Sequence, residues 1–378
     1  KKDHKWDYNH INIRNSTDYV AILEGTNPEG NRIRETGREF AARSLQTHLI
    51  QGDQLFRSFN QTGLRWHYSQ SKARRDEPGR TLDRYSPNRQ GQYVFNLEEN
   101  TNYQRRFYDL QENVEDWSFA LRTALPFWGG RKGEVELGAG HLQKKRESSM
   151  RRFGLEFTGE SCDADLSQSL DGIFAQCASS FTVANTTQPT DNYRASQNMQ
   201  SYFFKSQWPL LKNLNLSSGL RYEWSQQKVN SFANFSSQAV LTSLETKDLL
   251  PGHALTWKFF KKMQLRLAYS ETISRPDLRE LSNTLWQDFE TGYDVSGNPD
   301  LRATVIESYD LRWEWYFRPK ENVSVGVFYK DFINPIETQF RAGSDPRLVF
   351  NNAPEANIYG VEIAVSYTHL RAHETSGY

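Results

Sequence analysis

The sequence has no long apolar run, and this lack excludes one large class of protein. Its mean hydropathy is −0.77, and nowhere do about 18 apolar residues follow one another, the length that a membrane-spanning helix needs. A helical membrane protein is therefore excluded. A membrane β-barrel is not excluded, because barrel strands alternate apolar with polar residues and the interior and loops of a barrel are polar.

The chain also lacks net charge. Its 46 Lys and Arg residues balance 46 Asp and Glu residues, and no basic stripe interleaved with aromatic residues occurs. Nucleic acid is therefore not an expected partner. Aromatic residues make up 13% of the 378 residues, which argues against disorder and leaves room for two ordinary domains or one large β unit.

Cysteine is scarce. The two cysteines, Cys162 and Cys177, stand in one polar segment, SCDADLSQSLDGIFAQC. A pair so isolated from other cysteines favours a disulfide in an oxidising compartment, and the alternative is two free thiols.

Motifs for catalysis are missing. The sequence has no HExxH, no CxxC, no glycine-rich phosphate loop and no nucleophile elbow, and most of its histidines are scattered singly. No pair of carboxylates is singled out by its neighbours as a general acid and base. We therefore expect neither an enzyme nor a cofactor or metal site.

What the sequence does have is alternation. Between Ser308 and Phe332 two alternating runs flank a short polar turn, which predicts a β-hairpin. Similar segments recur along the chain and helical periodicity is nearly absent, so the chain is predicted to be all-β. The first strand of this hairpin has two different faces. One carries Tyr309, Leu311, Trp313, Trp315 and Phe317, and the other carries Asp310, Arg312 and Glu314.

Short and long connections take turns along the chain. The short ones are 128–133, 209–213, 258–262 and 318–322, and the long polar ones are 159–195, 229–247 and 271–302. In an up-and-down sheet, alternate connections lie at opposite ends, so the short turns gather at one end. Aromatic residues cluster beside these short turns, as in the belt that marks a membrane interface.

These patterns predict an antiparallel up-and-down transmembrane β-barrel. Its apolar strand face would meet lipid, and Asp310, Arg312 and Glu314 would line a wet interior. The alternative is a soluble β-sheet whose apolar face packs on a protein core.

The segment from Met263 to about Ile363 resembles the barrel of TonB-dependent outer-membrane receptors. The resemblance rests on LRLAYSETISRPDLREL, GNPDLRATVIESYDLRWEWYF, VSVGVFYKDFINPIE and NNAPEANIYGVEI. It implies a bacterial outer-membrane location and energised import of a scarce solute, such as a siderophore, cobalamin or an oligosaccharide. It also implies contact with TonB through an N-terminal plug, which is not recognisable in this sequence.

The predicted strand count makes the chain a barrel fragment. About 12 to 14 strands are expected, against roughly 22 in the family. The alternatives are a passive outer-membrane porin and a soluble β-rich binding module.

Two groups of residues are candidates for contacts with partners. The segment LWQDFETGYDVSGNPD offers Trp286 and Tyr293 for stacking and Gln287, Asp288 and Asp294 for hydrogen bonds to a small solute, although this loop could instead pack on itself. The basic runs 72–76 and 144–146 are expected beyond strand ends. They would lie in solvated loops, or contact outer-membrane lipid and lipopolysaccharide.

The two ends of the chain suggest boundaries. The first residues already alternate like a strand, which we interpret as the middle of a longer protein. After Val365 the run SYTHLRAHET abandons the alternation and resembles the translation of a DNA sequencing adaptor. Residues 1–365 are thus predicted to be the partial barrel, and residues 366–378 a non-native tail.

Overall fold

A single antiparallel sheet dominates the computed structural model, which describes residues 3–26, 30–95, 102–159, 164–233, 237–288, 293–318, 321–343 and 346–367, without the side chain of Gln287. In the described part of the chain the sheet has 14 strands, and its main path follows the chain order while skipping the short strands that lie in some of the connections. The strands of the main path are β1 (His4–Thr26), β2 (Arg32–Phe56), β3 (Thr62–Pro87), β5 (Tyr103–Pro126), β6 (Lys132–Phe157), β8 (Tyr193–Leu211), β9 (Leu214–Phe232), β10 (Ala239–Phe260), β11 (Met263–Ser274), β14 (Thr304–Arg318), β15 (Glu321–Ile333) and β18 (Glu355–Ser366).

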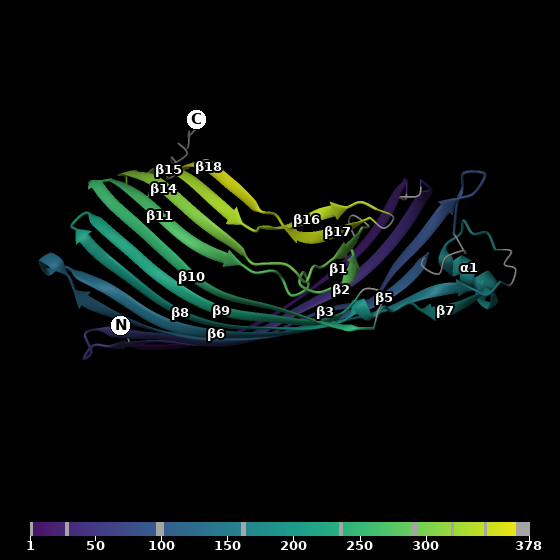
Figure 1. Ribbon diagram of the computed structural model, residues 1–378, viewed down its shortest axis with the longest axis horizontal. Coiled ribbons are helices and arrows are strands. Elements are labelled where there is room, and N and C mark those ends of the chain that lie inside the picture. The colour runs from purple at the N-terminus through teal and green to yellow at the C-terminus, as the bar shows by residue number, and fades with distance from the viewer. Residues whose placement is uncertain are drawn as a thin grey trace, which may run out of the picture.

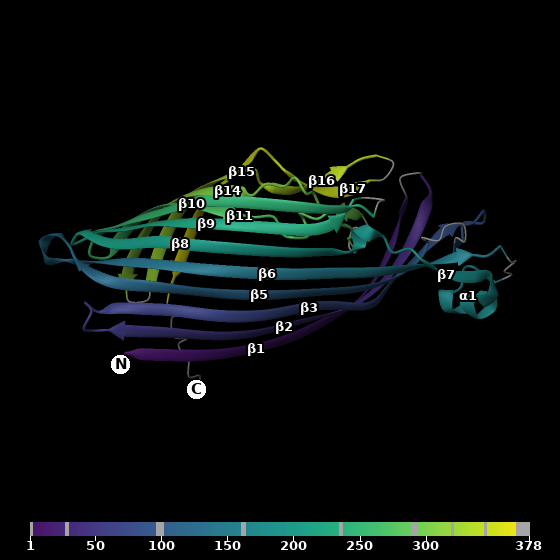
Figure 2. The same ribbon diagram turned by 60° about the horizontal axis from the view of Figure 1, so that its bottom comes forward.

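The sheet curves into a trough (Figure 1). Its long strands run side by side in Figure 2, and in the part of the chain that the structure describes β1 and β18 are its two edges. The predicted up-and-down antiparallel order is confirmed. Two short strands, β4 (Tyr93–Phe95) and β7 (Phe181–Asn185), pair with β3 and β6 outside the main path.

One end of the trough carries short turns, and the other end carries the long connections together with short ones between β1 and β2 and between β9 and β10. The turn with the 3-10 helix η1 (Trp128–Gly130) lies at the same end as the N-terminus. The connection that carries helix α1 (Leu170–Cys177) lies at the opposite end (Figure 1). Gly129 and Gly130 adopt positive φ of 69° and 72°, a backbone region that glycine reaches without steric cost, so the chain can reverse tightly here.

Two expectations about the connections were wrong. Most of segment 229–247 belongs to β9 and β10, and the basic runs 72–76 and 144–146 lie inside β3 and β6 rather than beyond strand ends. Strands of 23 to 26 residues, such as β1 and β3, are longer than the roughly 9 to 11 residues that cross a bilayer. Polar and charged residues therefore continue the strand pairing past the apolar band.

The outward face of β11, β14, β15 and β18 ends in a row of tyrosines. Tyr269, Tyr309, Tyr329 and Tyr359 are register partners, and the ring centroids of Tyr269 and Tyr309 lie 5.0 Å apart. The next outward residues of the first three strands are Glu271, Glu307 and Asp331. Together with the aromatic residues near the short turns, this row bounds an apolar band, as the two aromatic girdles of a membrane barrel do.

A second, smaller sheet is formed by two long connections. Its order is β12-β13-β17-β16, with bounds β12 (Leu285–Gln287), β13 (Asp294–Ser296), β16 (Ile336–Arg341) and β17 (Arg347–Asn352). The two remaining short helices are η2 (Ala178–Ser180) and η3 (Pro189–Asp191). Among the described residues, no helix is both long enough and apolar enough to cross a membrane.

Helix α1 is held by a cap and a small apolar cluster. The hydroxyl of Ser169 accepts a hydrogen bond from the backbone N–H of Gly172 at 3.4 Å, and Ile173 is fully buried next to Phe95. Cys177, at the end of α1, is disulfide-bonded. Cys162 lies outside the described residues, so the Cys162–Cys177 pairing stays a prediction.

The last strand runs across the predicted boundary at residue 365. Ser366 still belongs to β18 and pairs with Asn322 of β15. Residues 368–378 lie outside the described part of the chain, so a non-native tail from 366 to 378 stays a prediction.

Candidate functional site

The connection between β11 and β14 turns onto the inner face of the trough. We call its described residues, 275–288 and 293–303, the strap. Pro276 ends the preceding strand because it has no N–H for the ladder, and Asp277 and Glu280 then close a turn. The carboxylate of Glu280 accepts from the Asp277 N–H at 2.8 Å, and that of Asp277 accepts from the Arg279 N–H at 2.9 Å.

Apolar side chains anchor this turn to the barrel wall. Leu278 and Leu281, 2% and 0% exposed, pack in one cluster with Tyr193 of β8 and Val229 of β9. Burial of two leucines removes a large apolar area from water and stabilises the inward position of the strap by about 1.5 to 3 kcal/mol for each side chain.

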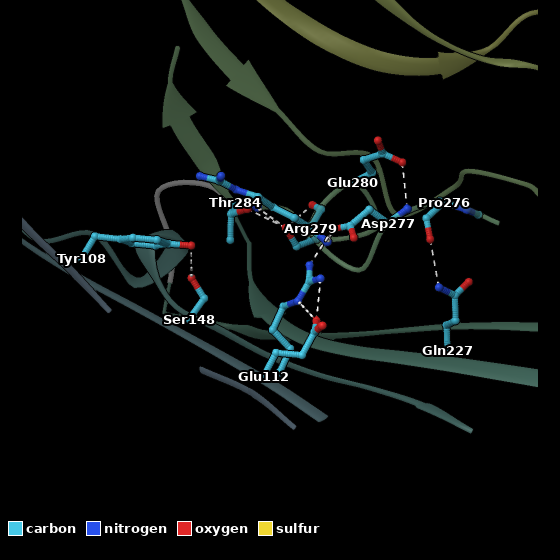
Figure 3. A network of polar contacts seen from close by, with 11 residues as sticks. Tyr108, Glu112, Ser148, Gln227, Pro276, Asp277, Arg279, Glu280 and Thr284 are labelled. Atoms are coloured by element: carbon cyan, nitrogen blue, oxygen red, sulfur yellow. Dashed lines mark hydrogen bonds and ion pairs between the residues drawn. The ribbon is translucent and has the colours of Figure 1, made fainter. Parts of the chain in front are cut away.

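Ion pairs then fix the strap to three strands. Arg275 donates to Glu223 of β9 at 2.8 Å and to Asp248 of β10 at 2.7 Å. Arg146 of β6 lies 2.7 Å from Asp277 and 2.6 Å from Glu112 of β5. Figure 3 shows Glu112 and Asp277. It also shows the amide of Gln227, which donates to the Pro276 carbonyl at 2.9 Å.

Burial and charge compete at the titratable groups of the strap. Burial raises the pKa of Asp277, but the hydrogen bond and the positive charge of Arg146 outweigh it, so the pKa lies below its ordinary value. Burial raises the pKa of Glu280, which has no such cation to offset it. Asp277 is thus held as a carboxylate facing Arg146.

Aromatic residues of the predicted solute loop pack within the protein. The guanidinium of Arg279 lies 3.9 Å from the ring centre of Trp286, and the Trp286 ring stacks with Phe350 of β17 at 6.1 Å. Tyr293 contacts Phe340 of β16 edge-on at 5.4 Å. These rings hold the small sheet together, so the alternative of a self-packed loop describes them well.

The polar members of that predicted loop are brought to one place. Gln287 of β12 and Asp294 of β13 are register partners, and Asp288 follows directly. The Asp288 N–H donates to the Tyr293 carbonyl at 2.9 Å. Contact of Trp286, Gln287, Asp288, Tyr293 and Asp294 with a solute stays a prediction.

The three candidates on β14 share the inner face. Asp310 pairs with Ala268 of β11, and Ala268 pairs with Ala254 of β10. Ala254 lies on the same face of β10 as Asp248, which binds Arg275 of the strap. Glu314 is buried and its carboxylate lies 3.0 Å from Arg312. That Asp310, Arg312 and Glu314 line a path for solute stays a prediction.

The residues that fix the strap were missed at the sequence level. The run Arg275-Pro276-Asp277 was noted as a mark of the resemblance, but its partners stand far away in the chain, and Arg146 precedes Asp277 by 131 positions. The only local sign of the strap in the sequence was that Arg, Pro and Asp follow directly after a strand. Among the described residues, no group of three or more His, Cys, Asp or Glu is placed to hold a metal ion.

Comparison with known proteins gives a family match over nearly the whole chain. The family described as TonB dependent receptor-like, beta-barrel, matches residues 2–378. No curated protein was found to match the sequence.

Several solved structures are similar to the chain at low identity. They include the alcaligin outer-membrane receptor FauA from Bordetella pertussis (14% identity, TM-score 0.45, 97% of this chain and 57% of that chain covered). Another is a mutant of the ferric enterobactin receptor PfeA from Pseudomonas aeruginosa (12%, 0.44, 94% and 60%). A third is the siderophore receptor PiuA from Acinetobacter baumannii (13%, 0.48, 95% and 59%). The chain thus spans less than two thirds of the length of these receptors.

Proposed function

Because the chain belongs to the TonB-dependent receptor family of bacterial outer-membrane proteins, we propose that it forms the barrel portion of a receptor for energised uptake. The solute would be scarce, such as an iron–siderophore complex, cobalamin or an oligosaccharide, and energy would come through TonB and a plug. The family consists of transporters rather than enzymes.

One observation carries the proposal against a passive porin. The strap lies on the inner face of the sheet and is held there by ion pairs in which Arg275 and Glu223 have side chains only 10% exposed. A diffusion pore needs an open interior, whereas a receptor needs groups that hold one solute until energy is supplied. An inner segment with fixed charges and aromatic rings supports the receptor.

A second part of the proposal concerns lipid. An outward groove of about 490 Å³ is lined in part by Lys145, Arg194 and Lys228. Ser196 of β8 also lines this groove. On the same face of β8, nearer the short turns, lies the exposed Tyr202. Cations just beyond an aromatic girdle are positioned for the phosphates of lipopolysaccharide, which supports outer-membrane lipid as a partner.

The test uses the full-length receptor in living cells. Uptake of radiolabelled ferric siderophores, cobalamin and oligosaccharides is measured with and without a protonophore. The proposal predicts saturable uptake of one solute class that the protonophore abolishes. Unsaturable passage of unrelated solutes regardless of the protonophore would identify a porin, and folding in buffer without lipid or detergent would identify a soluble module.

A further inference from the structure

Three arginines stand side by side on adjacent strands near the end that carries the long connections. Arg106 of β5 is the register partner of Arg80 of β3 on one side and of Arg152 of β6 on the other. Register partners share one face of a sheet with their Cβ atoms about 4.5 to 5.5 Å apart. The three form a row of like charges, which we call the arginine row.

The row is buried, and its middle member has no carboxylate partner. Arg80 and Arg106 are 9% and 7% exposed, and the side chain of Arg152 is 17% exposed. Arg106 donates to the side-chain oxygen of Gln104 through Nε at 3.0 Å and Nη2 at 2.5 Å. None of the ion pairs among the described residues includes Arg106, although buried cations are normally paired.

Part of the positive charge is balanced from outside the sheet. Arg152 forms an ion pair with Asp191 of η3, while its Nε is buried without a hydrogen-bond partner. Arg80 lies 3.7 Å from Glu39 of β2. Each of these carboxylates forms an ion pair with a flanking arginine, and Asp191 attracts Arg106 without forming an ion pair with it.

The strap covers the row with carboxylates of its own. Arg152 donates to the backbone carbonyl of Leu285, the first residue of β12, at 3.4 Å. Asp294 of β13 interacts electrostatically with Arg106, and Asp288 does so with Arg80. Asp294 is itself exposed, so a solute can reach it from water.

We propose that the arginine row is a binding site for a multivalent anion, and that Asp288 and Asp294 of the strap occupy it until such a solute displaces them. The inference rests on the proposed function and names its substrate class, a solute that presents several acidic oxygens. Guanidinium groups bind such oxygens in a fixed fork geometry, and adjacent forks favour a ligand with more than one negative charge. A neutral solute would gain nothing from displacing the two carboxylates.

The test compares two iron(III) complexes that differ in charge. The probes are the trianionic tris-catecholate and the neutral tris-hydroxamate, both labelled with radioactive iron and measured by equilibrium dialysis against the purified full-length receptor in detergent. Arg106→Gln removes the central cation, and Asp294→Asn removes a competing anion. Arg57→Gln, at an exposed ion pair with Asp3 near the short turns, is the control for an equal change of charge.

Opposite effects are expected from the two variants. The trianion should bind about tenfold more weakly to Arg106→Gln, since one charge-assisted hydrogen bond contributes about that factor, and several-fold more tightly to Asp294→Asn. Arg57→Gln should bind the trianion like the wild type, and the neutral complex should bind equally to all variants.

Three results would overturn the inference: no preference of the wild type for the trianion, equal binding of the trianion by Arg106→Gln and Arg57→Gln, or weaker binding by Asp294→Asn. If Arg106→Gln does not fold, the inference is tested by Asp294→Asn alone, which changes an exposed residue and should bind the trianion more tightly than the wild type. Binding in detergent requires neither TonB nor transport. If the variants bind the trianion in the expected order but cells show no energised uptake, the proposed function is refuted and the anion site is still supported.

Discussion

Arg275 and Glu223 form an ion pair of 2.8 Å in which each side chain is only 10% exposed. The same guanidinium reaches Asp248 on the next strand at 2.7 Å. One residue at the start of the strap therefore bridges β9 and β10, and it fixes where the strap leaves the wall.

Arg275→Gln should release the strap. The change leaves two carboxylates without their cation, and loss of one partner from a buried pair costs about 3 kcal/mol. Limited proteolysis of the strap and denaturant titration of the protein in detergent measure the effect. Arg194→Gln breaks a pair whose side chains are 78% and 59% exposed, so it should cost under about 1 kcal/mol. Equal stability of the two variants would contradict this role of Arg275.

Acid should loosen the strap through Asp277. Its pKa is lowered in the folded protein, so its pairing stabilises the strap above the unfolded pKa of about 3.9 and is lost as the pH falls below that value. The raised pKa of Glu280 contributes with the opposite sign. Protease sensitivity of the strap should therefore rise below about pH 4 in the wild type. Asp277→Asn should lack that rise, and an unchanged pH profile in this variant would refute the assignment.

Trp313 should tolerate exchange for another apolar residue. It lies in register with Leu265 and Val325 on the outward face, where lipid accepts Leu as readily as an aromatic ring. Trp313→Leu should cost under about 1 kcal/mol and Trp313→Arg about 2 kcal/mol, as measured by denaturant titration in lipid vesicles. Leu281→Ala, at a fully buried position, is the packed-core comparison at about 2 to 5 kcal/mol. A loss of several kcal/mol for Trp313→Leu would place Trp313 against protein.

The short turns should face the periplasm. Lys212, in the turn between β8 and β9, and Thr182 of β7 are both exposed and lie at opposite ends of the sheet. In intact cells a membrane-impermeant maleimide should label Thr182→Cys and spare Lys212→Cys in the full-length protein. Labelling of Lys212→Cys alone would reverse the orientation.

The strand faces could be predicted because they depend on local alternation. Trp313 and Arg312 fall on opposite faces whatever surrounds them, and the aromatic residues beside the short turns mark one end of the apolar band. The second girdle was missed, although Tyr269, Tyr309 and Tyr329 each precede or follow an outward acidic residue by two positions. That signal becomes visible only when the strands are aligned in register.

The inner site could not be predicted from local pattern. The sequence shows that segment 271–302 is long and polar, which suits an external loop as well as an inward strap. Its position depends on Arg146 and Glu223, which come from distant strands and whose inward direction follows from the strand register. Trp286 was singled out as an aromatic residue for stacking on a solute, which stays a prediction, and its contact with Arg279 depends on the same inward turn.

The inward position of the strap is the central claim, and one crosslink tests it most directly. The Asn283 N–H donates to the hydroxyl of Ser231 on β9 at 3.4 Å. The full-length protein with Ser231→Cys and Asn283→Cys should therefore form an intramolecular disulfide when cells are oxidised with copper phenanthroline. Ser231→Cys with Ser243→Cys, on the outward face of β10, is the control and should not crosslink. If the first pair stays unlinked and Asn283→Cys is freely alkylated from outside the cell, the strap lies outside the barrel and the account is wrong.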